Sequence, residues 1–236
     1  RNSELSVLRV VEDVVCDLLE VIDVDEHKFL FRSALESAVV NRHERIAIKV
    51  LTAVESKSSS LQKRHLVCNF EGISIALTNA ITHGMLSIIE TFVGMFDSRL
   101  LFFDCVSEDG SRVSPIRAAI AAKQISVATR FIEIVERHAQ TDGHEILFDE
   151  NIVVDAVNQG LPSVAERVIP SLFVNGQGTS HHLPWLIHAT GFGQIGVVKR
   201  TLEFFDPAKA AHVSIVRAAY DIAVNMRSKQ IAQLLA

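Results

Sequence analysis

The sequence predicts an all-α protein: an N-terminal capping helix followed by an array of about six helix–turn–helix repeats stacked as a solenoid. One apolar template recurs six times in the same register, and each copy is centred on an alanine. Successive anchor alanines are 33 to 42 residues apart, a period typical of helical repeat proteins. Glycine follows the anchor by four residues in three of the six copies. The anchors are Ala38, Ala80, Ala119, Ala156, Ala189 and Ala223.

Each copy of the template predicts two helices. Counted from the anchor, positions −3, 0 and +1 form one face of a first helix, and positions +8, +9, +12 and +13 form a stripe on a second helix. Around Ala119 the template places Ile116 before the anchor and Phe131 after it. At positions −3, +8, +9, +12 and +13 of all six copies, Thr201 is the one residue that is not apolar. Because such a helix pair cannot bury both of its faces alone, neighbouring repeats must stack.

A tight turn at position +4 is predicted to join the two helices. Gly84, Gly160 and Gly193 occupy this position, where a positive φ suits glycine. The other three copies have Arg42, Lys123 and Arg227 there, and each costs roughly 1 kcal/mol if φ is positive.

The predicted boundaries are 1–30 for the capping helix, or a truncated repeat, and 31–236 for the array. Residues 5–22 carry apolar side chains at helical spacing. Residues 133–150 are expected to form a long connection, and Asp109-Gly110 to turn a hairpin. The last helix has no polar cap, so more chain is expected to follow it.

The stretches SPIRAAIAAKQISVATRFI (114–132) and PWLIHATGFGQIGVVKRTL (184–202) carry a family resemblance. They are similar to the ankyrin repeat, whose helical part runs T-P-L-H-x-A-A-x-x-G-H-x-x-V-V-x-x-L-L. The resemblance covers about residues 31–236 and implies a helical solenoid. Ser114-Pro115 alone keeps the Thr-Pro pair of the family. The family histidine is absent from all six repeats, where Glu36, Thr78, Arg117, Val154, Ile187 and Asp221 take its place.

Charge is distributed unevenly along the chain. The formal net charge of −5 argues against a dedicated nucleic-acid binder. Residues 1–27 carry eight acidic residues against two arginines, and residues 28–69 carry eight basic residues against three glutamates. We interpret the two segments as solvated faces of opposite sign. Contact of the basic 28–69 face with RNA or phospholipid headgroups is a weaker alternative.

The cysteines indicate a reducing compartment. Cys16, Cys68 and Cys105 are odd in number, far apart in sequence and without a C-x-x-C pair, so neither a disulfide framework nor a zinc site is expected. The sequence has no uninterrupted run of 18 apolar residues, and a membrane span is therefore not expected. We expect an intracellular, cytoplasmic protein, with the nucleus as the alternative compartment.

A G-x-G-x-x-G pattern at Gly191, Gly193 and Gly196 raises the alternative of a dinucleotide-binding enzyme. That fold requires a strand before the motif, a helix after it and an acidic residue about 20 positions further on. In the repeat register Gly193 is the turn glycine, and the other two are interpreted as incidental. His181, His182 and His188 match no zinc spacing. We therefore predict no catalytic residues, no cofactor and no metal, and interpret the chain as a non-enzyme.

The resemblance implies that the chain binds a peptide or protein partner through a concave groove, lined by positions +2 and +3 and by the finger side of each first helix. An alternative is an intramolecular scaffold or regulatory domain that docks on another domain of its own chain. The residues expected just before each first helix are Arg32, Ser74, Arg112, Glu150, His182 and Arg217. The candidate partner-binding residues are Asn41, Thr82, His83, Ala122, Asn158, Gln159, Phe192, Met226, Arg112 and His182.

Overall fold

The computed structural model is mostly helical, which confirms the all-α class. Among the helices that it describes, none is long and apolar enough to cross a bilayer. The chain divides into two compact units, which are described separately below: unit 1, Arg1–Val127, and unit 2, Ala128–Ala236. The structure describes residues 14, 17–18, 28–57, 71–96, 105–106, 112–142, 148–174 and 184–236.

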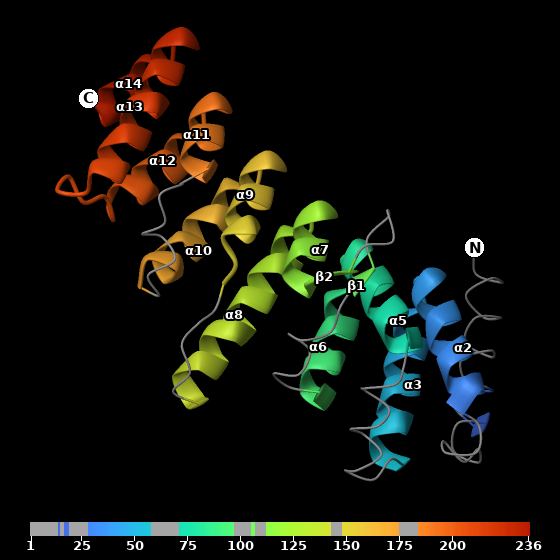
Figure 1. Ribbon diagram of the computed structural model, residues 1–236. Helices are drawn as coiled ribbons and strands as arrows, with labels where there is room; N and C mark the ends of the chain where they lie inside the picture. Colours follow the sequence, from blue (N-terminus) through green and yellow to red (C-terminus); the bar gives the residue numbers. More distant parts are fainter. Residues whose placement is uncertain are drawn as a thin grey trace. The chain divides into compact units, whose positions relative to one another are not determined.

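Unit 1 contains two rows of helices (Figure 1). The first helices form one row, in which α2 packs against α5 and α5 against α7. The second helices form the other row, in which α3 packs against α6. The helices of this unit are α2 (Lys28–Val40), α3 (Glu44–Lys57), α5 (Glu71–Thr82), α6 (Leu86–Phe96) and α7 (Pro115–Ala121), followed by the start of α8 (Ile125–Asp142).

A short hairpin precedes α7. Strands β1 (Cys105–Val106) and β2 (Arg112–Val113) pair antiparallel, with Cys105 opposite Val113. The predicted turn at Asp109-Gly110 falls between them, outside the described residues. Strand β1 packs against α5 and α7, and the Cys105 thiol is fully buried. Cys105 is a free cysteine, and the side chains of Cys16 and Cys68 lie outside the described residues.

Unit 2 contains the same two rows (Figure 1). The first helices pack in the order α9, α11, α13, and the second helices in the order α10, α12, α14. The described helices that lie wholly in this unit are α9 (Glu150–Asn158), α10 (Pro162–Val174), α11 (Pro184–Gly191), α12 (Ile195–Leu202), α13 (Ala210–Asn225) and α14 (Lys229–Leu235).

The core of each unit is built from the repeating template. All six anchor alanines are buried, none more than 4% exposed. Alanine at this position leaves room for the neighbouring helices to approach closely. Template residues outside the core are concentrated in the last repeat; they are Ile46, Val93, Leu202, Tyr220, Val224, Ala232 and Ala236.

Every repeat closes its first helix with the same turn. The N–H at +5 donates to the anchor carbonyl and the N–H at +4 donates to the carbonyl at +1, the two bonds of a Schellman motif. In the first repeat these bonds run from His43 to Ala38 (2.7 Å) and from Arg42 to Val39 (3.0 Å). The +4 residues all have positive φ, as predicted: Arg42 (59°), Gly84 (67°), Lys123 (56°), Gly160 (73°), Gly193 (71°) and Arg227 (56°).

Two segments differ from the sequence-based expectation. Helix α8 continues to Asp142, so the long connection expected at 133–150 is shorter. Residues 133–142 contain neither glycine nor proline, and nothing in them ends the helix. In the N-terminal segment Val14, Asp17 and Leu18 are helical, but Val14 and Leu18 are more than half exposed.

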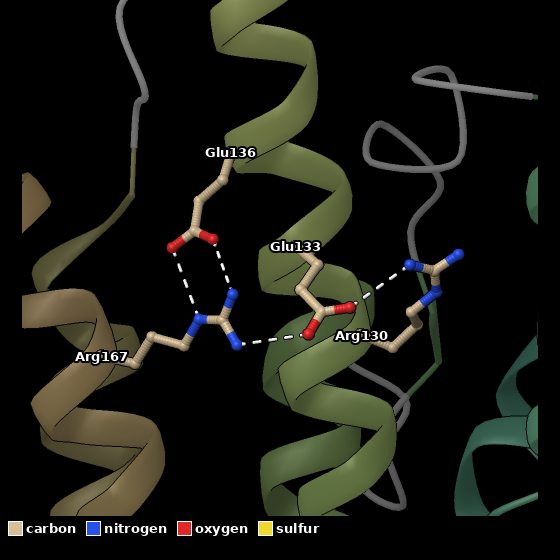
Figure 2. Close-up of polar contacts among 4 residues, drawn as sticks. All are labelled: Arg130, Glu133, Glu136 and Arg167. Atoms are coloured by element: carbon tan, nitrogen blue, oxygen red, sulfur yellow. Dashed lines mark hydrogen bonds and ion pairs between the residues drawn. The ribbon is translucent and has the colours of Figure 1, made fainter.

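An ion-pair network joins α8 to α10 (Figure 2). The Arg167 guanidinium donates to both carboxylate oxygens of Glu136, at 2.7 and 3.5 Å, and to Glu133 at 3.3 Å. Arg130 donates to the second oxygen of Glu133 at 3.2 Å. The hydrogen bond to Glu136 raises the pKa of Arg167 above its usual range. Because these side chains are about one-third exposed, the network orients the two helices more than it adds to stability.

Thr201, the polar exception in the template, is explained by Trp185. Both side chains are buried, and the Trp185 indole N–H donates to Thr201 Oγ1 at 3.3 Å. Thr201 Oγ1 in turn donates to the Val197 carbonyl at 2.8 Å. The other buried threonine of this repeat, Thr190, has a hydroxyl without a hydrogen-bond partner.

Replacing each of these two threonines by valine is expected to change the stability of the fold in opposite directions. Valine has the same shape without the hydroxyl, so Thr190→Val removes an unpaired buried polar group and should stabilise the fold by about 1 kcal/mol. Thr201→Val leaves the Trp185 N–H unpaired and should destabilise it by about 1–2 kcal/mol. Urea denaturation of both variants measures this, and changes of the same sign would contradict the assignment.

His212 is a buried imidazole at the start of α13. Its Nδ1 accepts a hydrogen bond from the Asp206 N–H at 3.1 Å, and its ring lies 5.6 Å from that of Phe205. Its Nε2 is buried without a hydrogen-bond partner. Burial lowers the pKa of His212 below its ordinary value of 6.5; Lys209 acts in the same direction and Asp206 opposes it. Neutral His212 therefore fits the fold and the imidazolium does not.

Stability is expected to fall below pH 6.5. Between 6.5 and the lowered pKa of folded His212, the unfolded chain binds more protons at this residue, so the free energy of unfolding decreases as pH falls. The slope from one group is at most about 1.4 kcal/mol per pH unit. In the variant His212→Asn the amide oxygen can still accept from the Asp206 N–H, but the side chain does not titrate. Its free energy of unfolding should therefore decrease less as pH falls below 6.5. Urea denaturation from pH 7.5 to 5 compares the two proteins, and parallel curves would contradict the assignment.

Candidate functional site

The predicted binding positions gather where the first helices end. Every first helix ends two residues after its anchor, and the turn follows directly. We call these segments the turn edge of each unit. The turn edge of unit 1 comprises residues 40–43, 82–85 and 121–124, and that of unit 2 comprises residues 158–161, 191–194 and 225–228.

Glutamines at position +5 connect consecutive turns. Gln194 Nε2 donates to the Val157 carbonyl at 2.7 Å, and Gln124 Nε2 donates to the Thr82 carbonyl at 3.1 Å. Both carbonyls lie at the C-terminal end of the preceding first helix, where few acceptors have a partner within the helix. The Val157 carbonyl also accepts the Schellman bond from the Gly160 N–H, so Gln194 supplies its second hydrogen bond. Gly84 makes room for Gln124, because a Cβ there would lie 2.5 Å from Gln124 Oε1. The turn edge is thus fixed between neighbouring repeats.

The turn edge of unit 2 carries amides. Asn158 and Gln159 are both exposed at the end of α9. Asn158 Oδ1 lies 2.7 Å from His188 Nδ1 on the neighbouring α11. With the amide oxygen accepting, His188 Nδ1 carries the proton, and Asn158 presents its NH₂ group as a donor.

Two large apolar side chains stand beside these amides. Phe192 and Met226 are each 61% exposed and occupy the same position, +3, after α11 and α13. Helices α11 and α13 pack against each other, which places the two residues on neighbouring turns. Both side chains are thus available to a partner. Segments 158–161 and 191–194 contain no charged residue, and Arg227 supplies the only formal charge of this edge.

The turn edge of unit 1 has different chemistry. Arg42 Nη2 lies 3.3 Å from His83 Nδ1, so the guanidinium donates to an unprotonated ring nitrogen. Arg42 and Lys123 are exposed, and His83 is half-buried. The cations are at position +4, which holds two glycines and Arg227 in unit 2, and His83 is at position +3, which holds Gln159, Phe192 and Met226 there.

The other candidate residues are less suited to binding. Asn41 Nδ2 and Thr82 Oγ1 donate to carbonyls of their own helices, Ser37 and Thr78, each at 2.8 Å. Ala122 is half-buried. Arg112 is exposed on β2, which precedes α7 in the chain. His182 lies outside the described residues. Arg32, Ser74 and Arg217 were expected before the first helices and instead lie within α2, α5 and α13, because these helices begin earlier than the template.

No family model, curated protein or solved structure matches this chain. The site must therefore be interpreted from its own chemistry. Within the described ranges, no group of three or more His, Cys, Asp or Glu side chains is arranged to hold a metal ion.

The glycine pattern lies in the repeat rather than in a nucleotide-binding turn. Helix α11 stands before it, where a dinucleotide-binding motif requires a strand. Gly191 ends α11 and Gly193 is the turn residue with φ of 71°. Gly196 lies beside the Glu166 carboxylate of α10, and a Cβ there would require the flexible Glu166 side chain to move.

Sequence analysis missed the contacts between repeats. Glutamine recurs at +5 in two repeats, and this recurrence was a signal for the carbonyl bonds of Gln124 and Gln194. The acidic pair Glu133 and Glu136 carries no local signal of its partner, because Arg167 is 31 residues further along the chain from Glu136.

Proposed function

We propose that the six repeats stack as an ankyrin-like solenoid and that the chain is a protein-interaction module. In this proposal the turn edge of unit 2 contacts a peptide or protein surface. Phe192 and Met226 are the apolar anchors, and Asn158 and Gln159 donate to backbone carbonyls of the partner. An apolar side chain of the partner would lie between Phe192 and Met226.

The exposure of Phe192 and Met226 carries this proposal. Phe192 and Met226 are each 61% exposed although an apolar side chain gains about 1.5–3 kcal/mol from full burial. A single exposed apolar residue is ordinary, but these two share one register position on adjacent repeats. Schellman bonds close both turns that present them, and Gln194 also ties the Phe192 turn to the preceding repeat, so little ordering entropy is lost on binding.

Affinity capture with matched variants tests the proposal. The wild-type chain, the double variant Phe192→Ala/Met226→Ala and the control Phe29→Ala are immobilised and exposed to extract of the source cells. Phe29 is 75% exposed at the start of α2 in unit 1, so its truncation removes an exposed aromatic without changing any residue of the proposed site in unit 2. Loss of a hot-spot pair should weaken binding of a captured partner about 30-fold or more, measured by titration.

The outcomes separate the alternatives. A partner lost in the double variant and kept by Phe29→Ala supports the site. A partner bound equally by all three proteins would move the interaction away from the turn edge of unit 2. A captured segment belonging to the same full-length protein would favour the intramolecular scaffold.

A further inference from the structure

The turn edge of unit 1 carries only basic and neutral residues. Its segments, VNRH, THGM and AAKQ, contain Arg42, His43, His83 and Lys123 and no acidic residue. Glu44 follows directly and keeps its negative charge, and its carboxylate accepts a hydrogen bond from Ser87 Oγ at the start of α6. Arg42 and Lys123 outweigh this one acid, so the edge has a net positive charge in a chain whose overall charge is −5.

Two of these cations occupy strained backbone positions. Arg42 and Lys123 have φ of 59° and 56°, where glycine is the unstrained residue. A non-glycine residue with positive φ costs roughly 1 kcal/mol or more. A cation at a helix C-terminus recovers only about 0.3–1 kcal/mol from the helix dipole. Folding therefore gains little from these cations over glycine, and both side chains are exposed, so they are available to a partner.

The two cations lie on the first and third of three consecutive repeats, and the imidazole of His83 lies on the second. Arg42 of the first repeat bonds to His83 of the second, and Gln124, next to Lys123, bonds to Thr82 of the second. Packed helices lie about 8–10 Å apart, and an extended chain advances about 3.3 Å per residue. Carboxylates at every third residue of an extended peptide would thus meet successive repeats.

We propose that the turn edge of unit 1 binds an acidic segment of a partner protein. One carboxylate pairs with the Arg42 guanidinium and another with the Lys123 ammonium. His83 accepts a hydrogen bond from Arg42 and so orients the guanidinium. This inference rests on the proposed function and adds the chemical class of partner. It concerns a different surface from the Phe192 and Met226 edge, and the two can be tested separately.

Three glycine substitutions test the proposal. The probe is a fluorescein-labelled peptide with Glu at every third position among Gly and Ser, and binding is measured by anisotropy. Arg42→Gly and Lys123→Gly should each weaken binding about threefold, and the double variant about tenfold. Arg227→Gly is the matched control, because it relieves the same strain in unit 2 and leaves the proposed surface intact. Each of the three single glycine variants should unfold at a higher temperature than the wild type. Weaker peptide binding by Arg42→Gly or Lys123→Gly then cannot be attributed to unfolding.

Three results would overturn the inference. One is equal binding of the probe by all variants; another is equal affinity for the same peptide with Gln in place of Glu. The third is preferential binding of single-stranded DNA or of phosphatidylserine vesicles over the peptide, which would assign the surface to another anion. If the peptide fails to bind while a captured partner still depends on Phe192 and Met226, this inference fails and the proposed function stands.

Discussion

Trp185→Ala is expected to lower the free energy of unfolding by about 4 kcal/mol. The side chain is fully buried, its ring edge lies against Phe173 with centroids 6.5 Å apart, and its N–H bonds to Thr201. Truncation leaves a cavity between α10, α11 and α12 and removes the partner of the Thr201 hydroxyl. Because Trp185 is the only tryptophan, urea denaturation must be followed by far-UV circular dichroism rather than by fluorescence.

Phe192→Ala is the matched control for this change. It removes an aromatic ring from the opposite end of the same helical segment, but the ring is 61% exposed. We expect its stability to stay within about 0.5 kcal/mol of the wild type. If Trp185→Ala were equally mild, the buried position assigned to the indole would be wrong.

Ala119→Leu is expected to destabilise unit 1 by about 2–3 kcal/mol through overpacking. Ala119 is fully buried on α7, which packs against α5 and β1. A larger side chain would have to displace these neighbours, since the interior is close-packed. The effect is measured as the shift in the urea midpoint at constant slope.

Ala121→Leu provides the control, two residues further along the same helix. Ala121 is exposed, so leucine there adds no volume to the core. Its effect should stay within about 0.5 kcal/mol. Equal destabilisation by the two substitutions would show that the anchor alanine does not set the spacing of the first helices.

The sequence predicted those features that depend on local patterns. The anchors, the two helices of each repeat and the turn at +4 follow from hydrophobic periodicity and from glycine spacing, and Arg42, Lys123 and Arg227 adopt the predicted positive φ. The template works because buried positions recur with the helical period within about sixteen residues.

Contacts between repeats could not be predicted in the same way. The bond between Trp185 and Thr201 and the bidentate pair of Arg167 with Glu136 join residues whose distance in sequence carries no period. The exposure of Phe192 and Met226 likewise depends on how far each first helix extends, and α13 begins well before its template. Side-chain partners depend on tertiary packing, which one repeat does not contain.

The Schellman turns also bear on how the chain folds. Each turn closes with hydrogen bonds that span at most five residues, and within each unit the first helices then pack against one another in chain order. Little loop-closure entropy is lost before such contacts form, and proteins rich in local contacts fold in microseconds to milliseconds. Folding can therefore start within a repeat, and the slowest step in each unit would be the docking of neighbouring helix pairs rather than the formation of any turn.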